Sequence, residues 1–237
     1  MILKHKKIVF AFLQCLFLSG CADVIISADD PMYFPMIPGI QWMYDTHSTV
    51  CLEGGIVVTN TTETICAVID TYTKAGITAA RLRGFPFGMD VWSGGTNIMD
   101  EILLVCIPAS QYHMLETTAV DRFADPNDFL LNLVNEKSLI LDCPLVAGKR
   151  FGEYEQLTRS DRNYSWNVES EQHYRIRGIT GVSPWATRTV YNLIYRTLSD
   201  VQRVVFVPGI GIIEYEYHHN GTPCDFRMLL KEFRKPD

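Results

Sequence analysis

The chain has 237 residues, 47% of them hydrophobic and 20% charged, and its formal net charge is −6. This length suits one large domain or two small ones, and the apolar content suffices for a buried core. An acidic chain without a cluster of basic residues is a poor candidate for nucleic-acid binding, which depends on phosphate neutralisation by Lys and Arg. For the same reason it is poorly suited to lying on an anionic bilayer without an anchor.

Residues 1–20 have the three parts of an export signal. A basic head at 4–7 precedes an apolar run, 8–18, in which Gln14 is the one polar side chain. The run is about 11 residues long, shorter than the roughly 20 that a membrane-spanning helix needs. Two small residues, Ser19 and Gly20, follow it. We therefore expect a cleaved leader and no permanent transmembrane segment here.

The sequence Leu18-Ser19-Gly20-Cys21 resembles the lipobox of bacterial lipoproteins. The resemblance implies cleavage between Gly20 and Cys21, a diacylglycerol on the Cys21 thiol and an acyl chain on the new amino group. Stable anchoring requires more than one such chain. Ala22, in place of an aspartate, implies an outer-membrane position facing the periplasm if the cell is Gram-negative. An ordinary secretory leader with an incidental cysteine is the alternative.

After cleavage we expect residues 21–32 to form a lipidated tether and residues 33–237 a β-rich globular domain. The leader contains three lysines and no acidic residue, which leaves 18 basic and 27 acidic residues and a net charge of −9. The membrane contact that we predict is therefore the lipid on Cys21, and no nucleic-acid partner is expected.

The first half of this domain predicts strands joined by short turns. Trp42 and Tyr44 alternate as on one face of a strand. An apolar strand at 98–107 ends at Pro108, and 111–117 is expected to pair back on it. The other predicted elements are strands at 56–59, 64–73 and 77–83, a turn at 60–62, a hairpin loop at 74–76 and a glycine-rich loop at 84–97.

One helix is predicted to begin near position 125. Asp125 suits the N-cap, Pro126 the first helical position, and Asp128 the first turn, where the helix dipole favours an acid. An apolar stripe at helical spacing follows, made of Phe129, Leu130, Leu133 and Val134. We expect a helix of about ten residues whose stripe packs on the core.

Strand signals continue to the C-terminus, at 138–143, at 148–151 and repeatedly from 164 to 233. Asn220-Gly221 predicts a hairpin with a two-residue loop. That loop sets a register in which paired residue numbers sum to 441, so that Tyr217 faces Cys224, Tyr215 faces Phe226, and Glu214 faces Arg227. The aromatic side chains of Tyr215, Tyr217 and Phe226 then share one face.

These elements favour a mainly β fold, a curved antiparallel meander or open barrel with one short helix packed against it. A β-sandwich is the alternative.

The candidate motifs for a nucleotide, metal or nucleophile site are incomplete in this sequence. Pro208-Gly209-Ile210-Gly211 lacks the third glycine of a dinucleotide fingerprint, and a strand follows it in place of a helix, so it predicts a turn. His218 and His219 are adjacent and point to opposite faces of a strand. Glu216, His218 and Asp225 do share a face, which we interpret as the solvent side of the sheet. No catalytic residue, metal site or cofactor is predicted.

Five cysteines follow Cys21, and the odd number leaves at least one thiol free. We expect Cys66 and Cys106, which lie in apolar strands, to be buried free thiols. The connectivity of any disulfide is open among Cys51, Cys66, Cys106, Cys143 and Cys224.

Two further stretches resemble a group of bacterial lipoproteins without an assigned activity. The first is Phe34-Pro35 followed by Gly39-Ile40-Gln41-Trp42-Met43-Tyr44, and the second is Phe206-Val207-Pro208-Gly209-Ile210-Gly211-Ile212-Ile213-Glu214-Tyr215. The alanine-glycine segment of that group is replaced here by Ser183–Arg188. The resemblance implies a β-rich envelope domain and no catalytic residues.

Our first functional hypothesis is a non-enzymatic, lipid-anchored envelope protein that binds a partner or ligand or supports envelope assembly. A curved sheet with an apolar concave face could hold a hydrophobic molecule. In that case Tyr215, Tyr217 and Phe226 would line the cavity; otherwise they belong to the core.

Two alternatives remain open. An anchored hydrolase acting on wall or surface polymers would need paired carboxylates in a cleft, for which Asp100, Glu101, Glu153 and Glu155 are available. A structural subunit of a larger surface complex is the other.

Overall fold

A computed structural model describes residues 33–52, 55–88, 101–108, 110–221 and 224–236 of the protein. The predicted cleavage site, Cys21 and the tether lie outside these residues, as does Asp100.

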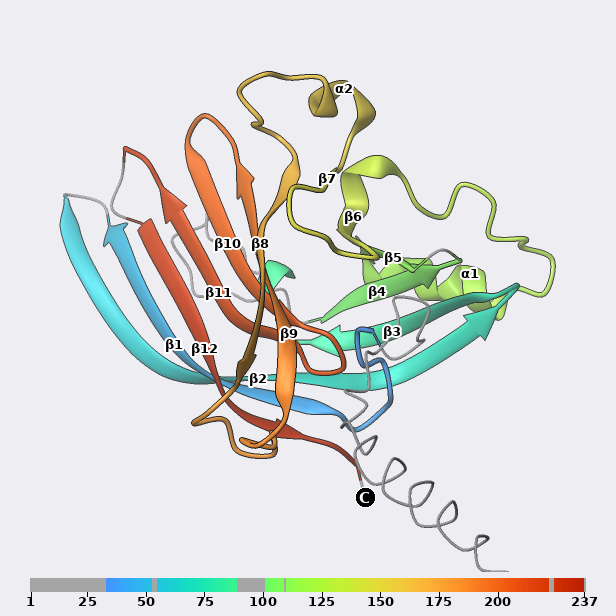
Figure 1. The fold of residues 1–237 in the computed structure, drawn as a ribbon. Helices are drawn as coiled ribbons and strands as arrows, with labels where there is room; N and C mark the ends of the chain where they lie inside the picture. Colours follow the sequence, from blue (N-terminus) through green and yellow to red (C-terminus); the bar gives the residue numbers. More distant parts are fainter. Residues whose placement is uncertain (1–32, 53–54, 89–100, 109, 222–223, 237) are drawn as a thin grey trace, which may run out of the picture.

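Twelve antiparallel strands in the described residues form one sheet, in the order β6-β5-β4-β3-β2-β1-β12-β11-β10-β9-β8-β7. Strands that are neighbours in sequence pair with each other, except β6 and β7, and β1 also pairs with β12, so two meanders meet along the first and last strands. The sheet curls into a nearly closed barrel in which β6 and β7 are the two edges (Figure 1). The strands are β1 (Gln41–Leu52), β2 (Ile56–Lys74), β3 (Ile77–Arg83), β4 (Glu101–Ile107), β5 (Gln111–Leu115), β6 (Leu139–Asp142), β7 (Arg150–Phe151), β8 (Trp166–Arg175), β9 (Thr187–Arg196), β10 (Asp200–Val207), β11 (Gly211–His219) and β12 (Cys224–Arg234).

This architecture confirms the predicted fold class and excludes the sandwich. It also confirms the hairpin at 74–76, the pairing of β4 with β5, and the turn at Pro208–Ile210 between β10 and β11.

The described helices are short, and the predicted helix at 125–134 is wrong. The helical residues of this region lie earlier, in the 3-10 turn η2 (Thr117–Ala119) and the helix α1 (Val120–Ala124). The other short helices in the described residues are η1 (Pro86–Gly88), η3 (Glu136–Ser138) and α2 (Tyr154–Leu157). None of the helices in the described part of the chain is long and apolar enough to cross a membrane.

The side chains chosen as helix caps close local turns instead. The Asp125 carboxylate accepts from the Asn127 backbone N–H, and the Asp128 carboxylate accepts from the Leu130 N–H and from the Arg122 guanidinium. Such short-range bonds compete with helical hydrogen bonding. Leu130 then has a positive φ of 56°, which a helix does not allow. Leu130 is nevertheless buried, because this segment covers the outer face of β3 and β4.

Two turn predictions are also wrong. Residues 60–62 do not form a turn, because β2 pairs with β1 without interruption from Ile56 to Ala67. The final hairpin pairs His219 with Cys224, so that paired numbers sum to 443 and four residues separate the strands. Pro223 lies in this connection and has no N–H to donate to a neighbouring strand, which disfavours the two-residue loop.

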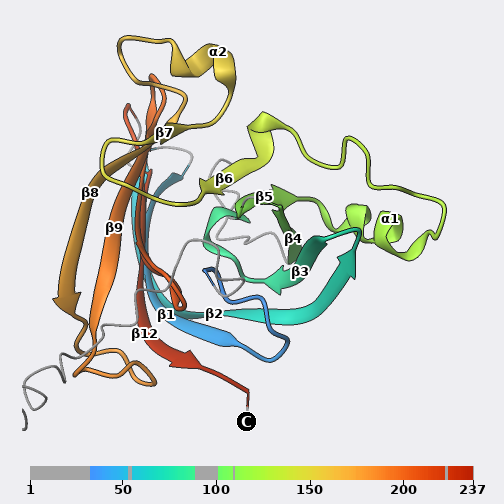
Figure 2. The ribbon, with the colours of Figure 1, turned by 45° about the vertical axis from the view of Figure 1, so that its right-hand side comes forward.

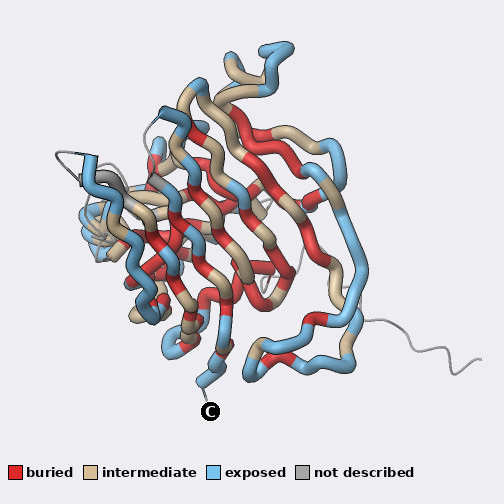
Figure 3. Tube along the Cα trace, turned by 90° about the vertical axis from the view of Figure 1, so that its left-hand side faces the viewer, coloured by how far each residue is buried: buried red, intermediate tan, exposed pale blue. Residues whose placement is uncertain are grey.

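A register change of two preserves which side chains share a face. Tyr217 therefore faces Phe226 and Tyr215 faces Met228, all on the buried side of the sheet. Glu214 lies opposite Leu229 and not Arg227, although the Arg227 guanidinium still reaches the Glu214 carboxylate. Figure 3 shows the resulting alternation of buried and exposed residues along the strands.

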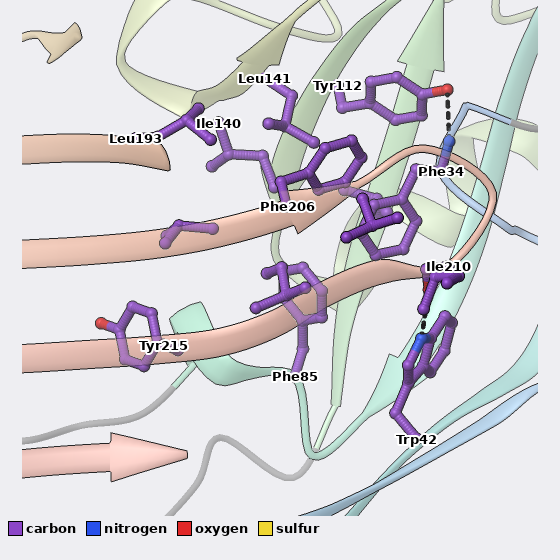
Figure 4. Packing of buried hydrophobic residues seen from close by; sticks show 14 of the residues in the cluster. Phe34, Trp42, Phe85, Tyr112, Ile140, Leu141, Leu193, Phe206, Ile210 and Tyr215 are labelled. Carbon is purple, nitrogen blue, oxygen red and sulfur yellow. Dashed lines mark hydrogen bonds between the residues drawn. The ribbon is translucent and has the colours of Figure 1, made fainter. Parts of the chain in front are cut away.

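The barrel interior is filled by aromatic side chains. Residues 33–40 enter it before β1, and the Phe34 ring lies 5.8–6.1 Å from the rings of Trp42, Phe85, Tyr112 and Phe206 (Figure 4). The Phe34 backbone N–H donates to the Tyr112 hydroxyl at 3.2 Å. Aromatic rings at such separations contribute packing beyond the apolar area that they bury. The interior is therefore a core to which the N-terminal segment belongs.

The two sequence stretches that resemble lipoproteins contact each other in this core. The Trp42 indole N–H donates to the Ile210 carbonyl at 2.6 Å, and the Tyr44 hydroxyl donates to the Ile212 carbonyl at 2.8 Å. Gly211 lies between these carbonyls, and a Cβ there would be 3.3 Å from the Trp42 nitrogen and 3.4 Å from the Phe34 ring. Trp42 and Tyr44, two residues apart on β1, thus bond to two carbonyls that are also two residues apart on the facing segment.

Three cysteines in the described residues have free thiols: Cys66, Cys106 and Cys143. Cys66 is buried in the core, and burial raises the pKa of its thiol. Cys106 is half-buried. Both were predicted to be free, and only Cys66 is fully buried.

Candidate functional site

The barrel is interrupted where β6 and β7 face each other, which we call the seam. The strands are joined by residues 143–149, and the Lys149 ammonium lies 3.0 Å from the Asp142 carboxylate and donates to the Pro144 carbonyl at 3.0 Å. Further along, the Tyr154 N–H donates to the Glu136 carboxylate at 2.8 Å, and Lys137 lies 4.0 Å from Glu153. Side chains and not a backbone ladder therefore hold the two edges together.

A hollow of about 230 Å³ opens at one end of the seam, and we call it the mouth hollow. Glu136 lies on one side of the seam and Glu153 on the other. The Trp166 ring forms part of the wall, 5.3 Å from the Tyr195 ring and 5.5 Å from the Phe87 ring. The full lining is Phe87, Met114, Glu136, Lys137, Leu139, Ile140, Gly152, Glu153, Tyr164, Trp166, Tyr195 and Gln202. Two carboxylates, an amide and several aromatic rings therefore share one hollow.

A second hollow of about 390 Å³, the side groove, shares Glu136, Leu139 and Gly152 with the first. It also contains the imidazole of His113, which is only 4% exposed. Its Nδ1 lies 3.1 Å from the Ser138 hydroxyl, and its Nε2 has no hydrogen-bond partner among the described residues. Burial lowers the pKa of His113 below its ordinary value of 6.5, so the ring is neutral at pH 7.

The Ser138 hydroxyl donates to the Asn135 carbonyl at 2.8 Å. If its single hydrogen is used there, it accepts from an Nδ1–H of His113, and Nε2 then carries a lone pair. Arg150 lines the same groove; its terminal nitrogens donate to the Leu157 carbonyl and the Ser165 hydroxyl, whereas its Nε is buried without a partner in the described residues. Unpartnered buried polar atoms are rare in folded proteins, and here an acceptor and a donor occur along one groove.

The predicted ligand contacts Tyr215, Tyr217 and Phe226 are all buried. The Tyr215 ring lies 5.3 Å from the Phe87 ring and 6.1 Å from the Phe226 ring, inside the core. Tyr217 and Phe226 also line a hollow of about 310 Å³ at the far end of β11 and β12, away from the seam. Their role as ligand contacts stays a prediction.

Tyr217 takes part in a polar cluster around Asp200, which is 7% exposed. The carboxylate accepts from the Tyr217 hydroxyl and the His219 Nδ1, both at 2.7 Å, and from the hydroxyls of Thr197 and Ser199, both at 2.9 Å. Burial opposes ionisation, but the four hydrogen bonds outweigh it and lower the pKa of Asp200. The cluster joins the tips of two hairpins, β9–β10 and β11–β12.

The two adjacent histidines diverge as predicted. His218 contacts Asp225 on the exposed face, whereas His219 bonds to Asp200 beneath the sheet. Glu216 lines the same outer hollow as His218 and Asp225. Across the residues that the structure describes, no group of three or more His, Cys, Asp or Glu side chains could hold a metal ion.

Of the three carboxylates considered for a hydrolase that the structure describes, Glu153 alone lies at the seam. Glu101 is on β4, 2.8 Å from Arg83 and 3.5 Å from Arg81, and Glu155 is exposed on α2. Sequence reasoning missed Glu136 and His113. A local signal existed for Glu136, because Asn135 and Ser138 form a capping box around it, but nothing local places it opposite Glu153.

No protein-family model and no curated relative matches the chain. Among solved structures, it is similar to a Bacteroides fragilis protein described as exported, with a YmcC-like fold; the identity is 14%, the TM-score 0.40, and the match covers 86% of this chain and 99% of that one. A Parabacteroides distasonis protein described as a lipoprotein matches at 10% identity and a TM-score of 0.33, over 86% and 98% of the two chains. Likenesses of this strength assign neither a family nor an activity.

Proposed function

We propose that the protein is an exported envelope protein, anchored through lipid on Cys21, whose barrel binds a ligand without chemical turnover at the seam. The anchor is supported by the sequence: a basic head, a short apolar run and all four positions of the lipobox agree. Ala22 favours the outer membrane, facing the periplasm, in a Gram-negative cell.

The observation that carries the binding proposal is the combination of groups at the seam. Two buried polar atoms that have no partner among the described residues, His113 Nε2 and Arg150 Nε, belong to residues that line the side groove. The elements that meet there are rigid, because β5, β8 and β9 are paired along both edges. A preformed concavity with a few polar groups is the usual form of a small-molecule site.

The mouth hollow suggests the chemical class of this ligand. The rings of Tyr164, Trp166 and Tyr195 provide flat apolar faces, and Glu136 and Glu153 provide acceptors for hydroxyl groups. Saccharide rings combine an apolar face with a rim of hydroxyls. We therefore propose a saccharide unit of an envelope polymer as the ligand.

Calorimetric titration of the purified protein with soluble fragments of peptidoglycan and surface polysaccharide tests this proposal. Glu153→Gln removes a charged acceptor from the hollow and should weaken binding by about tenfold or more. Glu155→Gln is the matched control, because Glu155 lies two residues further along the chain, on α2, is exposed and is absent from the lining. Binding of no fragment, or an equal loss in both variants, would refute the site.

A hydrolase is the second candidate, because Glu136 and Glu153 line one hollow from opposite sides of the seam. Glycosidases use two carboxylates separated by roughly 5–10 Å across the scissile bond. Release of reducing ends from a bound fragment, abolished in both Glu136→Gln and Glu153→Gln, would replace the binding proposal with this one. Binding without product release would favour the non-enzymatic protein.

A further inference from the structure

One end of the barrel carries both ends of the described chain. Because neighbouring strands are antiparallel, the start of β1, the end of β12, the β8–β9 loop at 176–186 and the β10–β11 turn lie at the same end (Figures 1 and 2). Tyr33, the first described residue, is also there, since its carbonyl accepts from the Gly209 N–H of that turn at 3.0 Å. We call this the tether end.

The β8–β9 loop is fixed to β12. The Thr180 N–H donates to the Lys231 carbonyl and the Phe233 N–H donates to the Thr180 carbonyl, both at 2.9 Å. Ile176 and Val182 are buried in the barrel core. Gly181, at a φ of +80°, approaches β12 so closely that a Cβ would lie 1.9 Å from the Phe233 carbonyl oxygen. The loop is therefore held in one position on the barrel.

This fixed loop presents an indole to solvent. Trp185 is 79% exposed, and Ile37, also at the tether end, is 41% exposed. Exposed apolar patches that are rimmed by polar residues mark protein–protein or membrane interaction sites. Tryptophan in particular is enriched where proteins meet the headgroup layer of a membrane.

Basic residues lie on the segments that form the tether end, although the chain without its predicted leader has a net charge of −9. Arg175, Arg177 and Lys235 are exposed, and none of them forms an ion pair within the described part of the chain. Arg234 pairs with Glu232 at 2.7 Å. The sequence suggested no basic cluster because these residues come from two segments about 60 residues apart, which the contacts of Thr180 bring together.

We propose that the tether end is a docking surface for anionic phospholipid, with Trp185 at the headgroup layer and Arg175, Arg177 and Lys235 facing the lipid phosphates. Basic residues near a membrane are attracted to its anionic lipids, and the indole supplies the apolar contact. The inference rests on the proposed anchor, since the 12 residues from Cys21 to the barrel can reach about 40 Å at most and the described chain begins at Tyr33, beside the β10–β11 turn of this end. The seam would then be held at a fixed orientation to the membrane.

Fluorescence quenching by lipid tests this surface. The protein, purified in the form that the cell produces, is reconstituted in vesicles of equimolar phosphatidylglycerol and phosphatidylcholine with brominated acyl chains. The difference between the natural protein and Trp185→Phe isolates the Trp185 signal. We expect strong quenching of that signal, lost in vesicles of phosphatidylcholine alone and at high salt.

Two charge variants sharpen the test. Arg175→Gln with Arg177→Gln should reduce the quenched fraction several-fold, since each basic residue near the surface changes partitioning about fivefold. Arg162→Gln is the matched control, because Arg162 is an exposed arginine in the turn before β8, at the opposite end of that strand from Arg175. An unquenched Trp185, or an equal effect of both changes, would overturn the docking surface.

The mass of the N-terminal peptide, measured on the same sample, separates this inference from the anchor. Acylated Cys21 with unquenched Trp185 would refute the docking surface and support the anchor. Quenched Trp185 with unacylated Cys21 would support the docking surface and refute the anchor.

Discussion

Replacing Phe34 with alanine should cost about 3–5 kcal/mol of folding free energy, the range for removing a buried phenylalanine. The ring is 2% exposed and lies among four other rings on four separate parts of the chain. None of these neighbours can move inward without leaving its own strand or turn, so the site can collapse only partly. The upper half of the range is therefore expected.

Urea unfolding followed by tryptophan fluorescence measures this loss. The midpoint should fall while the slope with denaturant stays constant, which indicates lower stability of the same fold. Ile37→Ala, in the same segment but 41% exposed, is the control and should change stability by no more than about 0.5 kcal/mol. A loss below about 1 kcal/mol for Phe34→Ala would show that the segment does not belong to the core.

A ligand experiment distinguishes a core from a natural cavity. An apolar void that opens when Phe34 is truncated should bind a small aromatic molecule such as benzene and regain part of the lost stability. The natural protein should show no such stabilisation. Equal stabilisation of both proteins would mean that the interior already has room for a hydrophobic ligand, in favour of the Tyr215, Tyr217 and Phe226 prediction.

Three further predictions follow from hydrogen bonds in the structure. Tyr44→Phe removes the donor to the Ile212 carbonyl and should lower the free energy of unfolding by about 1–2 kcal/mol in urea titrations, whereas no change would show that the carbonyl finds another partner. Asp200→Asn removes the charge that accepts four hydrogen bonds and should cost about 2–3 kcal/mol, and this cost should shrink as the pH falls through the lowered pKa of Asp200 in the folded protein, where the natural carboxylate becomes protonated as well. Folding lowers the pKa of His113, so its contribution to the free energy of unfolding is complete above pH 6.5, the ordinary pKa of histidine, and is lost as the pH falls through the folded-state pKa. The free energy of unfolding should therefore fall less below pH 6.5 in His113→Gln, and an equal pH dependence of the two proteins would contradict this.

The face of the sheet to which a side chain points could be predicted from the sequence where it depends only on the alternation of residues along a strand. Tyr215 and Tyr217 alternate with charged residues, so their inward direction survives the register error in the final hairpin. The loop length could not be predicted from Asn220-Gly221, because the next residues include Pro223 and the pairing depends on the whole of β12. The helix error has the same origin, since Asp128 bonds to Arg122 and Leu130 packs on a strand distant in sequence.

The seam and the tether end could not be predicted, because each is made by closure of the barrel. Glu136 and Glu153 are separated by 16 residues that include β6 and β7, and they share a hollow only because these edges meet. Arg177 and Lys235 come together only because the β8–β9 loop bonds to β12. No local pattern contains either pairing.

Mass spectrometry of the N-terminal peptide of the protein isolated from its cell envelope tests the central claim most directly. The proposed anchor predicts a mature chain that begins at Cys21, with a diacylglycerol on its sulfur and an acyl chain on its amino group. A chain that begins elsewhere, or one with an unmodified Cys21 thiol, would contradict it.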